Sequence, residues 1–139
     1  TTSAIDDHLT IVDISDPANM RVVGTIQDST NLDGAYGVVV IGKYAYVPAA
    51  FANRLTVVDI SDPSNPKVNT SIKDDDKFNQ PTAVALSGNY AYVPARYKSG
   101  LAVVNISNAT SAFNTSNSWR LAQISESLKI ISNSLNLLR

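Results

Sequence analysis

The segment Leu9–Pro17 has the sequence LTIVDISDP, and residues 55–63 repeat it almost unchanged as LTVVDISDP. A third and more divergent copy, LAVVNIS, occupies residues 101–107, so both steps are 46 residues long. A second block, GKYAYVPA at Gly42–Ala49, returns at the same step as GNYAYVPA at residues 88–95. Repetition at a fixed period of this size is the signature of a repeat architecture. The chain of 139 residues therefore contains about three copies of one 46-residue unit.

Each unit predicts four short strands, which we name A to D. β-branched and aromatic residues are concentrated in runs of strand length, and turn residues separate these runs. In the one complete unit we expect the strands at about Tyr36–Ile41 (A), Tyr44–Ala49 (B), Leu55–Ser61 (C) and about Lys67–Lys73 (D).

The residues between these strands have the chemistry of turns. Gly42-Lys43 suits a two-residue hairpin between strands A and B, because glycine tolerates a positive φ angle. The prolines and asparagine of residues 62–66 predict a wider bend between strands C and D. Pro48 and Pro94 have no amide hydrogen, so we expect strand B to stop pairing or to bulge there.

The hydropathy pattern of the strands indicates how the units are covered. Val38–Ile41 and Leu55–Ile60 are apolar on both faces, which is typical of strands buried on both sides. With no helical segment among the repeats to cover these faces, copies of the unit must cover one another, as the four-stranded blades of a β-propeller do. The paired tyrosines of strand B, Tyr44 with Tyr46 and Tyr90 with Tyr92, are predicted to pack between blades.

The recurring blocks of Leu9 to about Asn108 resemble the LVIVD-repeat β-propellers, which are related to the YVTN-type surface propellers. The resemblance implies an all-β fold of four-stranded antiparallel blades, and it implies a place on secreted or envelope proteins. It implies no particular activity, because the motif is structural. In the third copy Asn105 replaces aspartate and the Asp-Pro turn is lost, which departs from the pattern.

The repeat step divides the chain into four predicted segments. Residues 1–33 are a partial blade with strands C and D, residues 34–79 a complete blade, and residues 80–127 a degenerate blade. Residues 128–139 fit either an A–B hairpin of a further blade or a C-terminal amphipathic helix with leucine and isoleucine at heptad spacing. Propellers close with about four to eight blades, so the blades are expected to be incomplete as a single chain. They are then part of a longer propeller, or two copies complete a six-bladed ring.

Composition excludes several classes of protein. Eleven Lys and Arg against twelve Asp and Glu leave a formal charge of −1, which argues against a nucleic-acid partner. No apolar run is long enough for membrane insertion, and without cysteine there is no disulfide framework. The abundance of Ser, Thr and Asn favours an extracellular or cell-surface location. Glycosylation sequons at Asn69, Asn108 and Asn114 support this weakly, and a fourth, at Asn105, falls within a predicted strand.

Catalytic residues are not predicted. His8 is the only histidine, so neither a two-histidine metal site nor a second histidine for a catalytic relay is present. Asp13 with Asp16 recurs as Asp59 with Asp62, and such serial repetition fits turn capping better than a pair of catalytic carboxylates. No metal site is predicted and no cofactor is expected. Calcium at the Asp74–Asp76 run is the alternative, although the spacing of a calcium loop is missing.

The loops point to one end of the blades as a recognition surface. The A–B and C–D turns are nearly identical between copies, whereas the B–C and D–A loops, which emerge at the opposite end, vary. We expect a binding surface there, with two aromatic anchors and a charged rim. Its members are Phe51, Arg54, Arg96, Tyr97, Lys98, Asp74, Asp75 and Asp76.

These observations favour a non-enzymatic repeat module for binding a protein or glycan, or for structural assembly. Its partners would be other blades, a second copy of the chain, or a protein or glycan ligand. Two alternatives remain at this point. The chain could be a fragment of a larger propeller enzyme whose catalytic residues lie in other blades, or an oligomerisation element.

Overall fold

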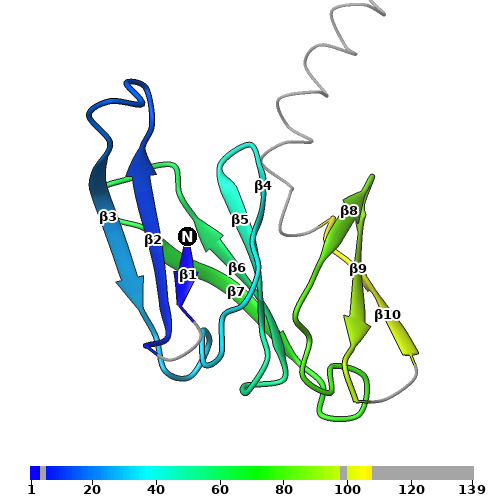
Figure 1. Ribbon diagram of the computed structural model, residues 1–139. Coiled ribbons are helices and arrows are strands. Elements are labelled where there is room, and N and C mark those ends of the chain that lie inside the picture. The colour runs from blue at the N-terminus through cyan, green and yellow to red at the C-terminus, as the bar shows by residue number, and fades with distance from the viewer. Residues whose placement is uncertain (4–5, 98–99, 108–139) are drawn as a thin grey trace, which may run out of the picture. The chain divides into compact units, whose positions relative to one another are not determined.

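The computed structural model describes residues 1–3, 6–97 and 100–107. Within these residues every regular element is a β-strand, and the strands form three separate antiparallel sheets (Figure 1). The prediction of an all-β fold built from antiparallel blades is confirmed, and the three sheets do not close into a ring.

The strands follow one another in chain order within each sheet. Sheet 1 consists of β1 (Thr2–Ser3), β2 (His8–Asp13) and β3 (Arg21–Gln27). Sheet 2 has four strands, β4 (Val39–Ile41), β5 (Tyr44–Ala49), β6 (Arg54–Asp59) and β7 (Lys67–Lys73). Sheet 3 consists of β8 (Ala85–Ser87), β9 (Tyr90–Ala95) and β10 (Gly100–Asn105).

Sheet 2 is the complete four-stranded unit, and its strands correspond to the predicted strands A to D. Sheet 1 also contains β1, a short strand that the sequence pattern did not indicate. Thr2 of β1 pairs with Leu9, as Pro48 pairs with Leu55 one repeat later, so β1 is equivalent to the end of strand B.

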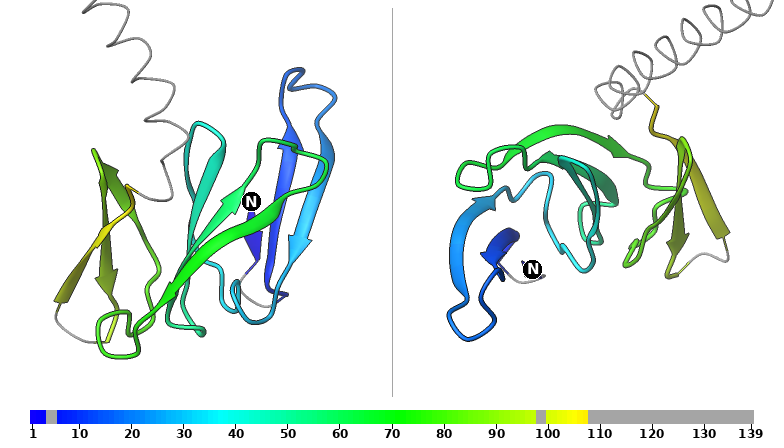
Figure 2. Two further views of the ribbon diagram at one scale, coloured as in Figure 1. Left: turned by 180° about the vertical axis from the view of Figure 1, so that it is seen from behind. Right: turned by 90° about the horizontal axis from the view of Figure 1, so that it is seen from above.

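The sheets are held together by two apolar interfaces, with sheet 2 between its neighbours (Figure 2). Successive side chains of a strand point to opposite faces, so sheet 2 can be apolar on both. One face contributes Ala45, Val47 and Val58 to a cluster that also contains Leu9 and Leu32. We call this the leading face, because it is directed toward the preceding repeat.

The opposite face of sheet 2, its trailing face, is directed toward the following repeat. It contributes Tyr44, Tyr46, Leu55 and Val57 to the second cluster. Facing them are side chains of sheet 3, among them Ala91, Val93, Ala102 and Ile106. The predicted packing of Tyr44 and Tyr46 between blades is therefore confirmed.

The predicted burial of strand A on both faces is wrong. Strand β4 has only three residues, and Val38, Val40 and Ile41 are exposed, whereas the apolar residues of β6 are buried on both faces. The reason is position in the sheet. Strand β4 is the edge strand of sheet 2, so it has a neighbour on one side only.

The predicted stop or bulge of strand B at Pro48 is wrong for the ladder with β6, whereas the ladder with β4 does end before Pro48. Strand β5 continues to Ala49, and Pro48 pairs with Leu55 of β6. The carbonyl oxygen of Pro48 accepts a hydrogen bond from the amide of Tyr36, 3.3 Å away, so this side of Pro48 faces the segment before β4. The missing amide hydrogen therefore interrupts the ladder with strand A and leaves the ladder with β6 intact.

The A–B hairpin turns confirm the glycine prediction. Gly42 and Gly88 have φ angles of 57° and 55°, in the left-handed region that favours glycine. The register shifts instead lie between strands C and D, at Ile11/Val12 and at the equivalent Val57/Val58. The alternative readings of residues 128–139, hairpin or helix, fall outside the described residues.

Gly24 of β3 lies against the C–D turn of sheet 2. A Cβ atom at this position would overlap the carbonyl oxygen of Pro63. We therefore expect Gly24→Ala to lower the free energy of unfolding by about 1–3 kcal/mol or more, because backbone atoms cannot move aside as flexible side chains do. Gly100→Ala is the matched control, because a Cβ there meets no atom within 4 Å. Urea unfolding measures both, and equal stabilities of the two variants would contradict this contact.

The hydroxyl group of Tyr46 is buried in the interface between sheets 2 and 3 without a hydrogen-bond partner. Burial, together with the neighbouring Tyr44, raises the pKa of Tyr46. Removing an unsatisfied buried polar group relieves its desolvation cost, so Tyr46→Phe should stabilise the chain by about 1 kcal/mol. Tyr92→Phe, at the equivalent and less buried position, should be nearly neutral. Thermal unfolding tests this, and destabilisation by Tyr46→Phe would refute it.

Candidate functional site

The B–C and D–A loops lie together at one end of the sheets, the lower end in Figure 1. We call this the loop end. It comprises residues 28–35, 50–53, 74–81 and 96–97. Its loops are joined through backbone hydrogen bonds: the amide of Phe51 donates to the oxygen of Asp33 (3.1 Å), and the amide of Arg96 donates to Asn79 (2.9 Å). Each B–C loop is therefore fixed to the D–A loop that precedes its own sheet.

Each D–A loop is closed by an aspartate at its start. Asp28 accepts hydrogen bonds from the amides of Thr30 and Asn31, both at 2.9 Å. Partial burial opposes the charge of Asp28, but the hydrogen bonds from Asn31 and Thr30 outweigh it and lower its pKa. Asp74, 46 residues later, accepts from the amides of Asp76 (3.1 Å) and Lys77 (2.8 Å). These carboxylates thus hold the shape of their loops.

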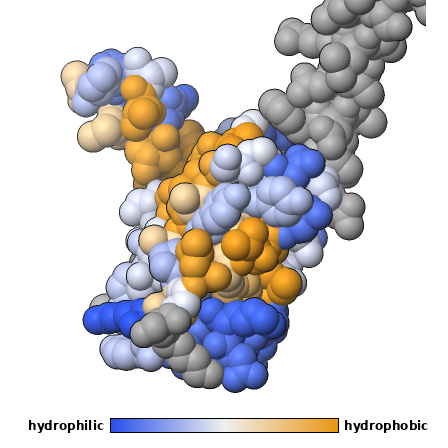
Figure 3. Space-filling model, turned by 90° about the vertical axis from the view of Figure 1, so that its right-hand side faces the viewer, coloured by the Kyte–Doolittle hydropathy of each residue, from blue (hydrophilic) through white to orange (hydrophobic). Residues whose placement is uncertain are grey.

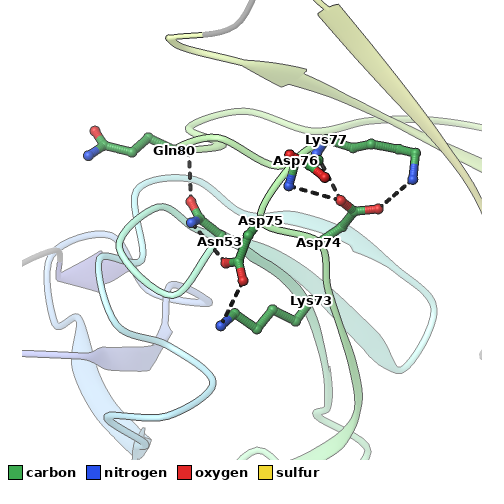
Figure 4. Close-up of polar contacts among 7 residues, drawn as sticks. All are labelled: Asn53, Lys73, Asp74, Asp75, Asp76, Lys77 and Gln80. Carbon is green, nitrogen blue, oxygen red and sulfur yellow. Dashed lines mark hydrogen bonds and ion pairs between the residues drawn. The ribbon is translucent and has the colours of Figure 1, made fainter.

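A second polar contact closes the D–A loop from the side of the B–C loop (Figure 4). Asn53 has a positive φ of 50°, and its Oδ1 accepts a hydrogen bond from the amide of Gln80 at 3.0 Å. Its Nδ2 donates to Asp75 at 3.2 Å. Asp7 occupies the equivalent place one repeat earlier, with φ of 55° and Oδ1 accepting from the amide of Gly34.

Asp7 also forms an acidic pair with Asp33. Burial, together with the negative charge and hydrogen bond of Asp7, raises the pKa of Asp33 above its usual value. In the next repeat the equivalent positions are Asn53 and Asn79, which carry no charge. The first D–A loop therefore holds a carboxyl group that is costly to ionise, and the second does not.

The predicted aromatic anchors are both exposed at the loop end. Phe51 is 53% exposed, and its ring meets that of Tyr36 edge-on, with 6.2 Å between centroids and 85° between planes. Tyr97 is 64% exposed, and the guanidinium of Arg96 lies 5.2 Å from its ring centroid. Such contacts orient a ring without covering it. The loop end thus presents one aromatic group from each of two successive repeats.

The predicted charged rim contains exposed residues and two partly buried ones, Arg54 and Asp74. Arg54 is half-buried and donates through Nη1 to Ser71 Oγ (2.8 Å), which in turn donates to Asn31 Oδ1 (2.7 Å). This chain of hydrogen bonds connects sheet 2 to the preceding D–A loop. Arg54 therefore has a part in joining the repeats, which its sequence position alone did not indicate.

The aspartate run 74–76 has internal partners (Figure 4). Asp74 pairs with Lys77 Nζ at 2.7 Å, and Asp75 pairs with Lys73 Nζ at 3.1 Å. The hydrogen bond from Lys77 is the largest of the effects that lower the pKa of Asp74. Asp76 is exposed. The remaining rim residue of the prediction, Lys98, lies outside the described residues.

At the opposite end the C–D turns are capped as predicted. Asp13 Oδ1 accepts from the amide of Ser15 (3.0 Å), and Asp59 accepts from Ser61 (2.9 Å). These hydrogen bonds hold the pKa values of both aspartates below the usual range. Asn105 accepts from Ser107 in the same way at 2.9 Å, so the third copy keeps the cap although aspartate is replaced. These residues are structural caps.

Other predicted features are placed as follows. Asn69 of the first sequon is exposed on β7, whereas Asn108 and Asn114 lie outside the described residues. Among the described residues no group of three or more His, Cys, Asp or Glu side chains is arranged to hold a metal ion. The part of the chain that the structure describes also has no helix long and apolar enough to cross a membrane.

Sequence reasoning missed three residues whose contacts hold the loop end in place, namely Tyr36, Asp7 and Asn53. Tyr36 was assigned to strand A, yet it supports the ring of Phe51. Asp7 and Asn53 received no role, although both are short polar residues 46 apart that tolerate a left-handed backbone. Their recurrence after 46 residues could have predicted the hydrogen bonds that they accept from the D–A loops.

A family model described as LVIVD repeat matches the chain at residues 4–28, 34–74 and 81–116. The three matched segments together cover more than half of the 139 residues and follow the three repeats. None of the curated proteins compared with the chain matches it significantly.

The acidic pair predicts a pH-dependent gain from Asp33→Asn. The folded-state pKa of Asp33 is raised, so its ionisation costs stability once the pH exceeds its usual value. Asp33→Asn should therefore raise the melting temperature at pH 7, and the gain should vanish near pH 3, where the wild-type carboxyl is protonated. Asp62→Asn is the control, because the pKa of Asp62 is lowered and no gain is expected. Melting curves at both pH values check this, and a gain independent of pH would contradict it.

Proposed function

This chain belongs to the LVIVD repeat family, and we propose that it is a non-enzymatic β-propeller repeat module that binds a protein or glycan ligand through its loop end. The proposal includes a place on a secreted or cell-surface protein. The exposed sequon asparagine Asn69 and the richness in Ser, Thr and Asn support that location.

The observation that carries the proposal is the pair of exposed aromatic rings at equivalent positions, Phe51 and Tyr97. Apolar side chains of this size are normally buried, and here each is more than half exposed. Both lie two residues after the end of strand B and 46 residues apart, so two successive repeats present them at the same end.

The backbone around the rings supports a recognition role. The B–C loop is held by hydrogen bonds from the amides of Ala50 and Phe51 to the oxygens of Gly34 and Asp33. A side chain on such a fixed loop loses little conformational freedom on binding, which favours affinity. Loops on a rigid scaffold are also the usual location of binding residues.

The chemistry next to the rings suits a polar ligand with an apolar patch. Arg96 lies against Tyr97, and exposed carboxylates of Asp75 and Asp76 lie at the same end. An aromatic anchor surrounded by polar groups is the arrangement typical of interface hot spots. The flat face of an aromatic ring equally suits the apolar face of a sugar.

The enzymatic alternative has less support in the described residues. The carboxylates near the loop end mostly accept backbone amides or pair with lysines, as Asp28, Asp74 and Asp75 do. The oligomerisation alternative is favoured by a different observation, the exposed apolar face of sheet 3, where Leu101 and Val103 are more than half exposed.

Phe51→Ala combined with Tyr97→Ala tests the proposal. A glycan array and a panel of extracellular-matrix proteins, probed with the wild-type chain, identify a ligand, and titration calorimetry measures its affinity. We expect the double variant to lose about tenfold or more in affinity, because truncated aromatic anchors typically cost more than 1 kcal/mol each. Its stability should change by less than about 0.5 kcal/mol for exposed positions.

Val40→Ala is the control, because this exposed apolar residue of β4 lies away from the loop end and is not part of either ring. It should leave ligand affinity unchanged. Full affinity in the Phe51/Tyr97 double variant would refute recognition through these two rings.

A further inference from the structure

Sheet 3 exposes an apolar face on the side directed toward a following repeat. We define the trailing face of sheet 3 by Tyr90 and Tyr92 of β9 and Leu101 and Val103 of β10. Leu101 and Val103 are 59% and 56% exposed, and Tyr90 is exposed as well. Figure 3 shows apolar side chains gathered on this side of the molecule, above a hydrophilic band at its lower end.

The same four residue types occur at the equivalent positions of sheet 2, and there they are buried. Tyr44, Tyr46, Leu55 and Val57 precede the four residues of the trailing face of sheet 3 by 46 positions each, with identical side chains. Leu55 and Val57 are only 1% and 3% exposed. The exposed face is therefore a residue-for-residue copy of an interface that already exists within the chain.

The internal interface shows what kind of surface covers such a face. The trailing tyrosines of sheet 2 pack against the small side chains Ala91 and Ala102, with Val93 beside them. Large residues on one side and small residues on the other allow the two sheets to interdigitate at close-packed density. A suitable occupant is thus the leading face of another blade of the same repeat.

One leading face is partly exposed in the described part of the chain, that of sheet 1. We define it by Thr10 and Val12 of β2, by Ile14 directly after this strand, and by Val22 of β3, which pairs with Val12. The first three are identical to Thr56, Val58 and Ile60, of which Thr56 and Val58 are fully buried in sheet 2. In sheet 1, Ile14 is 68% exposed and Val22 is exposed as well.

We propose that the trailing face of sheet 3 in one copy of this chain binds the leading face of sheet 1 in a second copy. The contact repeats between molecules the packing that sheets 1, 2 and 3 use within one molecule. Such a head-to-tail contact joins two different surfaces, and it forms a ring where the rotation closes. Two copies bring six blades, complete or partial, within the range of about four to eight at which propellers close.

The alternative of a symmetric contact between two trailing faces fits less well. It would place the tyrosines of both copies against one another, whereas the leading face of sheet 1 offers them the smaller side chains Thr10 and Val12. The inference also goes beyond ligand recognition at the loop end, because neither face contains Phe51 or Tyr97. The two proposals therefore stand or fall separately.

The mass of the 139-residue chain in solution tests the proposal, measured by light scattering after gel filtration at several concentrations. We expect about twice the 14.9 kDa of one chain. Leu101→Glu and Ile14→Glu each place a charge on one of the two faces, and each should reduce the species to the mass of one chain. Both residues are exposed, so the fold should persist, which circular dichroism verifies.

Mixing the two variants separates a head-to-tail contact from a symmetric one. Leu101→Glu keeps its leading face and Ile14→Glu keeps its trailing face, so an equimolar mixture should recover the doubled mass through one intact interface. Val40→Glu is the control, because this exposed residue of β4 lies on neither face, and it should keep the doubled mass.

Three results would overturn the proposal. A wild-type chain with the mass of one copy at all concentrations would assign the face to residues after 107 of the same chain or to another partner. A doubled mass in either single variant would show that one face pairs with itself. A mixture that stays at the mass of one chain would show that the two faces do not bind each other.

Discussion

The structure depends on the burial of sheet 2 between its two neighbours. A sheet whose strands are apolar on both faces needs a cover on each side, and sheets 1 and 3 supply it through Leu9 and Leu32 on one side and Ala91 and Val93 on the other. Apolar burial is the main driving force of folding, so a repeat of this kind is not stable alone. Stability is therefore a property of neighbouring repeats and not of a single blade.

The two internal interfaces share an apolar pattern but differ in the contacts added to it. Between sheets 2 and 3, tyrosines meet alanines, and the close fit leaves the hydroxyl of Tyr46 buried without a partner. Between sheets 1 and 2, polar contacts add to the apolar cluster: Asn31 accepts from Thr56 through its backbone oxygen and from Ser71 through its side chain. The apolar pattern is thus shared, while the contacts of Asn31 belong to the interface between sheets 1 and 2.

The interfaces also fix the loop end. Once adjacent sheets are packed, the B–C loop of one lies within hydrogen-bond distance of the D–A loop that precedes it, and backbone amides close the contact at Phe51 and Arg96. Asn53 and Asp74 complete the closure with their side chains. Backbone and short polar side chains hold the loops, and the rings of Phe51 and Tyr97 remain exposed.

The sequence by itself determined the repeat, the order of the strands and the caps of the turns, because these depend on local spacing: 46-residue steps, glycine at Gly42 and aspartate at Asp13 and Asp59. It also indicated that Phe51 and Tyr97 are equivalent. Only the tertiary structure decided that Val40 is exposed, although the apolar run around it resembles that of β6. It also decided that Arg54 connects two repeats. The reason is that burial and side-chain partners depend on which sheet lies opposite, and residues far apart in the chain supply that surface.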